Sequence, residues 1–186
     1  RWPHKRKDKY IEYPIYLAYM VAVLEEAGFD VAFVDAIMDE LDVAGFAERV
    51  NQVAPQLLVM ECSTPSIRYD LQSAEAVKKA LPGCYIALVG SHASVFHEDI
   101  LRENQSVDAV VRGEFEITVR ELAKAIATGA DWSNVEGLSY RNGDEVRVNS
   151  DRPVIENLDD LPFPARHIVR GGGYRAAIFT GDHTTA

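Results

Sequence analysis

A chain of 186 residues, of which 47% are hydrophobic and 26% charged, can bury one sizeable core and has an ordinary globular composition. Its net charge of −10 repels a nucleic-acid backbone, so we expect no nucleic-acid partner. The sequence has no apolar run long enough for a membrane span and no export leader, and its two cysteines cannot make a disulfide scaffold. We therefore expect a cytoplasmic protein without a membrane partner.

Helical and extended patterns alternate along the chain. Apolar residues three and four positions apart predict helices, and short uncharged runs predict strands that are buried on both faces. In chain order, the predicted helices cover residues 15–27, 42–53, 67–80, 97–102 and 117–127. The predicted strands cover residues 29–34, 56–60, 84–89 and 107–111. This rhythm favours right-handed parallel crossovers, and hence an α/β fold with a doubly wound, mostly parallel, Rossmann-like (flavodoxin-like) sheet.

After residue 130 the alternation of helix and strand patterns ends, and hairpin and linker signals follow. Residues 138–141 and 145–148 flank Asn142-Gly143-Asp144, which is a strong β-hairpin signal. Residues 157–164 form a proline-stiffened linker, and the apolar residues 176–179 predict one more strand. We therefore expect a C-terminal β-hairpin and linker after the α/β sheet.

Three of the predicted strands end in small or polar loops. In a parallel sheet these loops meet at the carboxyl edge, which is where open α/β sheets bind ligands. Glycines and hydroxyl groups in that position suit a large, flat or polar-tailed ligand better than a metal ion. The candidate binding residues are Ser63, Thr64, Ser66, Gly90, Ser91, His92, Ala93, Ser94, Gly113, Glu114, Phe115 and Glu116.

Each of these loops also has a simpler interpretation. Ser63 or Ser66 can cap the helix that follows. Glu114 and Glu116 open a helix, and the positive end of a helix dipole favours carboxylates whatever the function. His92 has no second histidine or carboxylate at metal-binding spacing, so we expect no metal site.

Other α/β families fit the motifs less well. Asp35 follows a predicted strand, but no glycine-rich phosphate fingerprint precedes it, which argues against a nicotinamide cofactor. A phosphate-accepting receiver domain needs an aspartate at the end of its central strand, where this chain has Glu61-Cys62-Ser63. No Gly-x-Ser-x-Gly elbow or cysteine–histidine pair indicates a nucleophilic hydrolase, so we predict no catalytic residue.

Several segments together resemble one known family. They are Ser63-Thr64, the run Gly90-Ser91-His92-Ala93, the block from Asp108 to Thr118, residues 137–141 and the linker at 158–166. In this order they are similar to the cobalamin-binding domain that precedes the catalytic barrel of many radical S-adenosylmethionine (SAM) enzymes. The resemblance extends from about residue 14 to residue 166, and its most specific parts are residues 108–118 and 159–165.

The resemblance implies a division of the chain and a set of cofactors. Residues 1–130 are expected to bind cobalamin at the twelve candidate residues, residues 131–166 to form the hairpin and linker, and residues 167–186 to begin a radical SAM barrel. The whole polypeptide would be a methyltransferase whose barrel holds a 4Fe-4S cluster and SAM. This chain lacks the three cysteines that hold the cluster, so we expect it to be inactive by itself.

The chain departs from the family pattern at three points. Ser91 replaces the second glycine of the usual Gly-Gly pair. His4 lacks the flanking aspartate and glycine of an Asp-x-His-x-x-Gly signature, so we expect cobalamin to be held without a histidine ligand from the protein. The first strand of the domain is expected before Arg1, and the cluster cysteines after Ala186.

Two alternatives remain open at this point. One is a flavodoxin-like domain that holds another ligand or none, with loops that serve only as helix caps. The other is a structural domain whose cobalamin site has degenerated. A bulky residue at Gly90 separates these alternatives from a cobalamin site: a large loss of cobalamin affinity with intact folding would support the cobalamin site and contradict both alternatives.

Overall fold

The computed structural model describes residues 11–168 and Tyr174. The predicted strand at 176–179 and most of the predicted barrel segment at 167–186 lie outside these residues. The helices are α1 (Ile15–Glu26), α2 (Val43–Val53), α3 (Ile67–Ala80), α4 (Ser91–Val95), α5 (His97–Glu103) and α6 (Glu116–Thr128), with 3-10 turns at Trp132–Asn134, Leu158–Asp160 and Arg166–Ile168. The strands are β1 (Leu57–Glu61), β2 (Tyr85–Val89), β3 (Ala109–Val111), β4 (Leu138–Asn142) and β5 (Glu145–Val148).

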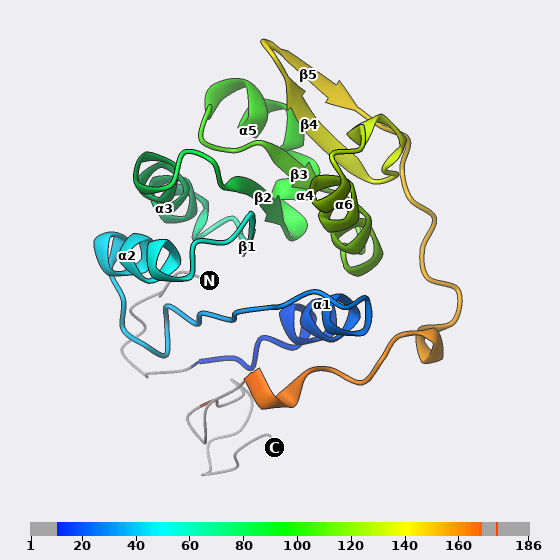
Figure 1. The fold of residues 1–186 in the computed structure, drawn as a ribbon, viewed down its shortest axis with the longest axis horizontal. Helices are drawn as coiled ribbons and strands as arrows, with labels where there is room; N and C mark the ends of the chain where they lie inside the picture. The colour runs from blue at the N-terminus through cyan, green and yellow to red at the C-terminus, as the bar shows by residue number, and fades with distance from the viewer. Residues whose placement is uncertain (1–10, 169–173, 175–186) are drawn as a thin grey trace.

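The five strands form one sheet in the order β1-β2-β3-β4-β5 (Figure 1). β1, β2 and β3 are parallel, and the β4–β5 hairpin continues the sheet with antiparallel pairing. The predicted α/β class, the parallel strands and the C-terminal hairpin are confirmed. Because the three parallel strands run in the same direction, their carboxyl ends lie at one edge of the sheet.

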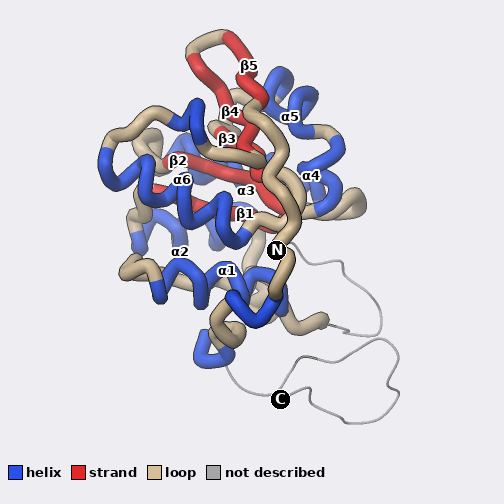
Figure 2. Tube along the Cα trace, turned by 90° about the vertical axis from the view of Figure 1, so that its right-hand side faces the viewer, coloured by secondary structure: helices blue, strands red, loops and turns tan. Residues whose placement is uncertain are grey.

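Helices cover both faces of this sheet (Figures 1 and 2). α1 and α6 pack on one face, and α2, α3 and α5 pack on the other. Along β2, Ile86 and Leu88 belong to the second of these two cores, whereas Ala87 and Val89 belong to the first, and all four residues are 0% exposed. The uncharged run at 84–89 is therefore buried on both faces, as predicted.

Local signals set several helix ends. Asp42 caps α2, because its Oδ1 accepts a hydrogen bond from the Gly45 amide at 2.8 Å. Ser66 was a candidate cap for α3, but it makes no side-chain cap bond to that helix. The Ser66 hydroxyl instead accepts a hydrogen bond from the Ser63 amide at 3.0 Å, within the turn that follows β1.

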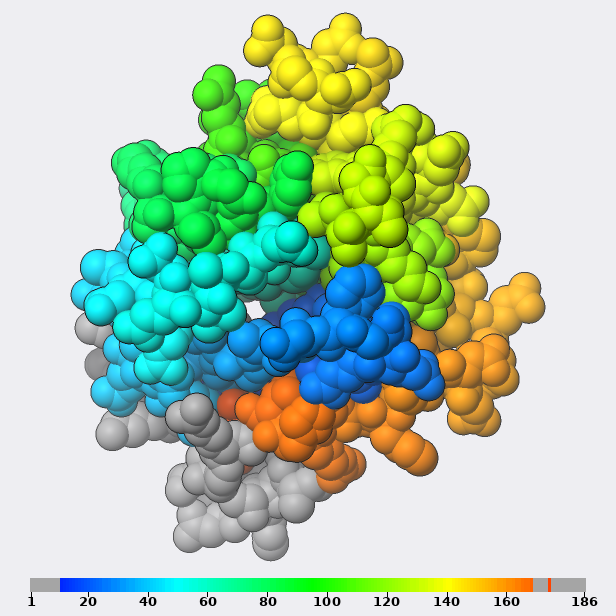
Figure 3. All heavy atoms as spheres, in the orientation of Figure 1, coloured from blue at the N-terminus to red at the C-terminus, as the bar shows by residue number. Residues whose placement is uncertain are grey.

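The prediction of a strand at residues 29–34 is wrong. This segment is extended, but it does not pair with any strand of the sheet. A strand requires a neighbouring backbone to share its hydrogen bonds, and a cavity separates this segment from β1. Figure 3 shows the opening between the blue and cyan parts of the surface. The apolar pattern thus predicted the extended conformation but could not predict the pairing.

The two cysteines behave as small apolar residues. Cys62 and Cys84 are free, buried thiols, so neither forms a disulfide. Both pack in the core on the α2–α3 face. No helix in the described part of the chain is both long enough and apolar enough to cross a membrane.

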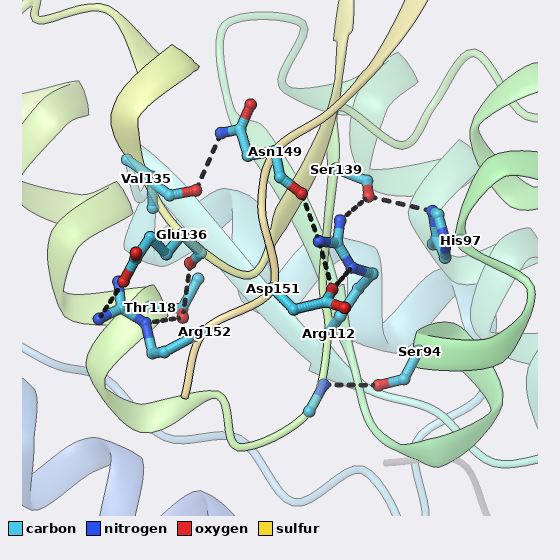
Figure 4. A network of polar contacts seen from close by, with 11 residues as sticks. Ser94, His97, Arg112, Thr118, Val135, Glu136, Ser139, Asn149, Asp151 and Arg152 are labelled. Atoms are coloured by element: carbon cyan, nitrogen blue, oxygen red, sulfur yellow. Dashed lines mark hydrogen bonds and ion pairs between the residues drawn. The ribbon is translucent and has the colours of Figure 1, made fainter. Parts of the chain in front are cut away.

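Two arginines fasten the segment after the hairpin to the sheet (Figure 4). Arg112, which directly follows β3, is buried and donates hydrogen bonds to the Asn149 carbonyl at 2.6 Å and to Asp151 Oδ1 at 2.8 Å. Arg152 donates to Thr118 Oγ1 on α6 at 2.7 Å. These bonds hold the start of the linker beside the turn between β3 and α6.

The two ends of the Arg112–Asp151 ion pair should differ in their importance for stability. Replacing Arg112 with leucine should cost about 3 kcal/mol of unfolding free energy, because the half-buried Asn149 carbonyl and the buried Ser139 hydroxyl lose the hydrogen bonds that the guanidinium donates. Replacing Asp151 with alanine should cost less than about 1 kcal/mol, because its side chain is 91% exposed and solvent screens the charge. Urea unfolding followed by circular dichroism measures both values, and equal losses would contradict the role of Arg112 as the anchor.

Candidate functional site

A cavity of about 1060 Å³ lies at the carboxyl edge of the parallel strands. This volume is at the upper end of the range for small-molecule sites, so the cavity suits a large ligand. Its walls come from the three turns after β1, β2 and β3, from the start of α1 and from the linker. The lining residues are Ile11, Glu12, Tyr16, Tyr19, Ile37, Glu61, Cys62, Ser63, Ser66, Gly90, Ser91, Ser94, Val95, Gly113, Glu114, Phe115, Glu116, Ile155, Leu158 and Leu161.

The turn after β1 presents a pair of hydroxyl groups to the cavity. The Ser63 and Ser66 hydroxyl oxygens are 2.9 Å apart, and the Ser66 hydroxyl also lies 3.2 Å from the Ser63 carbonyl, to which it can donate. Ser66 is buried, whereas Ser63 is half-buried. The mutual bonds hold both side chains in a fixed position, so a ligand would meet a small polar surface that is already ordered.

The turn after β2 depends on Gly90. Its φ of 107° and ψ of 170° lie in a region that is essentially restricted to glycine. A Cβ atom at this position would lie 2.5 Å from the carbonyl oxygen of Cys62, which belongs to the neighbouring turn. Gly90 therefore allows the two turns to pack directly against each other at the edge of the cavity.

Hydrogen bonds join the turn after β3 to its neighbours. The Gly113 amide donates to Ser94 Oγ at 3.0 Å, and Ser94 Oγ donates to the Gly90 carbonyl, also at 3.0 Å. On the other side, the Ile155 amide of the linker donates to Glu114 Oε2 at 2.7 Å. The cavity wall is thus continuous from the β2 turn through the β3 turn to the linker.

Carboxyl groups dominate the charge of the cavity, which is lined by Glu12, Glu61, Glu114 and Glu116. Burial raises the pKa of Glu116 above its ordinary value. Carboxyl groups are strong hydrogen-bond acceptors, so this lining suits a ligand whose rim carries N–H donors and does not suit a ligand that is anionic throughout.

Burial raises the pKa values of two further groups, Cys62 beside the cavity and Asp70 on α3. Burial, with a smaller contribution from Asp70, raises the pKa of the Cys62 thiol to about 12, so it is not a thiolate nucleophile near neutral pH. Burial also raises the pKa of Asp70 on α3 to about 6, and its Oδ2 atom has no hydrogen-bond partner among the described residues. Neither group is positioned as a reactive residue.

Comparison with known families identifies the cofactor of this domain. The family model of the B12 binding domain matches residues 5–123, which is well over half of the chain. The chain belongs to the B12-binding domain family. Its cofactor is therefore cobalamin, and the flavodoxin-like alternative without cobalamin is not supported.

Relatives of this B12-binding domain are longer proteins. An uncharacterised methyltransferase of Pyrococcus horikoshii is 30% identical over 164 residues, which cover 88% of this chain but 35% of the relative. The cobalamin-dependent radical SAM methyltransferase TokK of Streptomyces tokunonensis is 28% identical over 113 residues, covering 60% of this chain and 17% of that protein. The chain thus spans only about a third or less of the length of these relatives.

Solved structures share the fold. The cobalamin-dependent SAM radical enzyme OxsB, with aqua-cobalamin and SAM bound, superimposes with a TM-score of 0.75 at 14% identity over 86% of this chain and 22% of that chain. The radical SAM methyltransferase TsrM of Kitasatospora setae, with cobalamin and a [4Fe-4S] cluster bound, gives a TM-score of 0.67 at 18% identity over 82% and 28% of the two chains. The B12-binding domain therefore has the Rossmann-like architecture that these proteins contain.

Nine of the twelve residues predicted from the sequence lie around the cavity, and three do not. Ala93 is buried in the core on the α2–α3 face. Thr64 and His92 do not line the cavity; the Thr64 hydroxyl and His92 Nδ1 lie 3.1 Å apart near the surface. No group of three or more potential metal ligands is found within the described residues. That the nine residues contact cobalamin remains a prediction.

Several cavity residues were missed by sequence reasoning. Tyr16 and Tyr19 reach the cavity from α1, and Ile155, Leu158 and Leu161 reach it from the linker. The tyrosines lie about one helical turn apart near the start of α1. This spacing of two large aromatic residues was visible in the sequence and could have indicated a binding surface. In the structure, Tyr16 is 63% exposed. The linker residues gave no such signal, because hydrogen bonds between residues distant in the sequence, such as those of Arg112, Arg152 and Glu114, bring that segment back to the sheet.

A side chain at Gly90 should destabilise the fold itself, so a bulky residue there is a poor test of cobalamin affinity alone; a matched pair of substitutions tests this steric argument. Gly90→Ala should cost about 3 kcal/mol of unfolding free energy, because the new Cβ meets the Cys62 carbonyl and the backbone angles exclude other residues. Gly113→Ala should cost only about 1 kcal/mol, because Gly113 has a positive φ of 69° but open space around it. Chemical denaturation of both variants tests this order, and the reverse order would refute the packing argument.

Proposed function

We propose that the cavity at the carboxyl edge holds the nucleotide tail and lower face of cobalamin. The observation that carries this proposal is that the turns after all three parallel strands meet around one large cavity in a domain of this family. Small residues of the β1 and β2 turns leave space for the tail, and the acceptors Glu12, Glu61 and Glu114 suit the amide groups on the rim of the corrin ring.

We further propose that no histidine of this domain binds the cobalt. None of the described residues that line the cavity is a histidine. His92, which belongs to the turn after β2, instead lies beside Thr64 and stacks on Phe96 with a ring-centroid distance of 4.7 Å. The bound cofactor would therefore supply a cobalt centre whose lower face the protein covers without coordinating it.

Tryptophan substitutions at two serines, one inside and one outside the cavity, test whether the cavity is the cobalamin site. Ser91 lines the cavity, and its side chain makes no hydrogen bond to another described residue, so Ser91→Trp should fill space that the cofactor needs without removing an internal contact. We expect its affinity for hydroxocobalamin to fall at least about tenfold, since burial of the ligand would be blocked. An absorbance titration followed by gel filtration measures this. Ser150→Trp, at an exposed serine outside the cavity, is the control.

Two results would contradict the proposal. One is a Ser91→Trp variant that binds as tightly as the parent chain, and the other is a parent chain that is folded but elutes without colour. Circular dichroism of each sample separates loss of the site from loss of the fold.

For the whole polypeptide, we propose a cobalamin-dependent radical SAM methyltransferase, in which a barrel with a 4Fe-4S cluster and SAM comes after the linker. The sequence similarity to the methyltransferase TokK and the structural similarity to the methyltransferase TsrM support this proposal. Further support comes from the linker, where Val154, Leu158 and Phe163 are 72%, 67% and 93% exposed. Apolar side chains so exposed along one segment are typical of a surface that another domain covers. Residues 167–186 would begin that domain.

The full-length protein provides the test of this assignment. After anaerobic reconstitution with iron and sulfide, it should transfer the deuterated methyl group of labelled SAM to reduced cobalamin, with release of S-adenosylhomocysteine, only when cobalamin and a reductant are both present. Mass spectrometry measures the product. SAM turnover that is equally fast without cobalamin would contradict the assignment, and the 186-residue chain serves as the control that lacks the cluster cysteines.

A further inference from the structure

Tyr174, which lies beyond the linker, is buried against two segments from the other end of the chain. Its side chain is 5% exposed. The Tyr174 hydroxyl donates a hydrogen bond of 2.9 Å to Asp35 Oδ2. The Tyr174 ring also packs edge-on against Tyr13, with a ring-centroid distance of 5.7 Å and an interplanar angle of 72°. Tyr174 thus joins two segments that are far from it in the sequence.

Asp35 binds Tyr174 with one carboxylate oxygen and its own turn with the other. Asp35 Oδ1 accepts hydrogen bonds from the Ile37 amide at 3.1 Å and from the Met38 amide at 3.3 Å. Asp35 is 7% exposed, and a buried carboxylate needs hydrogen-bond donors because water no longer solvates it. The Tyr174 hydroxyl therefore helps to fix the carboxylate that shapes this turn.

Both contacts of Tyr174 lie directly behind the large cavity at the carboxyl edge of the sheet. Glu12, the residue before Tyr13, lines that cavity, and so does Ile37, two positions after Asp35. Tyr174 itself does not line the cavity. It can affect a ligand there only through the two neighbours that it contacts.

The end of the linker is also docked on this side of the domain. The Ala165 amide donates to the Ala18 carbonyl of α1 at 2.9 Å. His167 Nε2 lies 2.9 Å from Glu25 Oε1, near the end of the same helix. Figure 1 shows the 3-10 turn at the end of the linker beside α1. The contact of Tyr174 therefore continues an interface that begins along α1.

We propose that Tyr174 is a positioning residue for the large cavity, because it holds two parts of the cavity wall through Asp35 and Tyr13. Walls that are already ordered strengthen binding, since less conformational entropy is lost when the ligand enters. The apparent affinity falls in proportion to the fraction of molecules whose site is ordered. Docking of the segment that begins the C-terminal domain would thus raise the affinity for cobalamin, a consequence that rests on the function proposed above.

Amide hydrogen exchange of the 186-residue chain, measured by NMR without cobalamin, tests the positioning role. Tyr174→Phe removes the hydroxyl and keeps the ring, so it breaks the bond to Asp35 alone. A hydrogen bond to a charged group changes a local equilibrium by about tenfold or more. The Ile37 and Met38 amides should therefore exchange about tenfold faster. Exchange in the β4–β5 hairpin, which is remote from Tyr174, should change by less than about twofold.

A hydroxocobalamin titration of the same variant tests the effect on the site. We expect the affinity of Tyr174→Phe to fall at least about threefold while its circular dichroism is unchanged. A residue that contributes only to stability would leave the affinity of the folded molecules unaltered. Tyr85→Phe, at the amino end of β2 and outside the cavity, is the matched control and should bind as the parent chain does.

Substitutions of Asp35 test whether Tyr174 acts through this carboxylate. Asp35→Asn keeps an oxygen for the turn, and its amide nitrogen can donate to the Tyr174 hydroxyl, so the affinity should stay within about twofold of the parent. Asp35→Ala loses both bonds and should bind at least as weakly as Tyr174→Phe. Adding Tyr174→Phe to Asp35→Ala should cause no further loss, because the partner of the hydroxyl is already absent.

Several outcomes would overturn the proposal. They are unchanged exchange at Ile37 and Met38 in Tyr174→Phe, parental cobalamin affinity of that variant, a further loss in the double variant, or an Asp35→Asn variant as weak as Asp35→Ala. A Tyr174→Phe variant that loses its fold would also overturn it, since the role would then be general stability. A parent chain that binds no cobalamin would refute the proposed function, whereas exchange at Ile37 and Met38 would still decide the positioning role.

Discussion

Parallel pairing of β1, β2 and β3 is the constraint on which the rest of the structure depends. It brings three turns from distant parts of the sequence to one edge, and it requires crossovers from β1 to β2 and from β2 to β3. The crossover helices α3 and α5 cover one face of the sheet, and α1 and α6 cover the other. The turns can meet only because Gly90 has no side chain, since any Cβ there would collide with the Cys62 carbonyl. The cavity is thus a consequence of strand direction and of one position where the backbones touch.

The linker is the part of the cavity wall that is held mainly by polar contacts. Arg112 and Arg152 bind the start of the linker, and Glu114 accepts a hydrogen bond from the Ile155 amide. Arg112 is 8% exposed, so its charge is tolerated because the guanidinium donates to several acceptors at once. These anchors carry Leu158 and Leu161 to the cavity without a hydrophobic core of their own. In the full-length enzyme proposed above, a linker held in this way would couple the position of the C-terminal domain to the proposed cofactor site.

The sequence predicted the features whose cause is local. The uncharged run at 84–89, the Asn142-Gly143-Asp144 turn and the Asp42 cap each carry their own signal, and all three have the predicted structure. It could not predict the state of residues 29–34, because pairing depends on a neighbour and not on the segment itself. The same reason explains Thr64, His92 and Ala93. They lie in the right turns, but the direction in which a side chain points within a turn depends on helix α4 and on packing, which sequence spacing does not reveal.

The two outer edges of the sheet, β5 and β1, differ in the side chains that they carry. Natural outer edges are protected by charged side chains, and β5 fits this pattern with Glu145 and Arg147. The outer edge of β1 carries Leu57 and Val59 between two helical layers, which is the character of an internal strand and would be an aggregation hazard on an exposed edge. Since Glu61 at the end of β1 also faces the large cavity, any segment that orders this edge also orders one wall of the site.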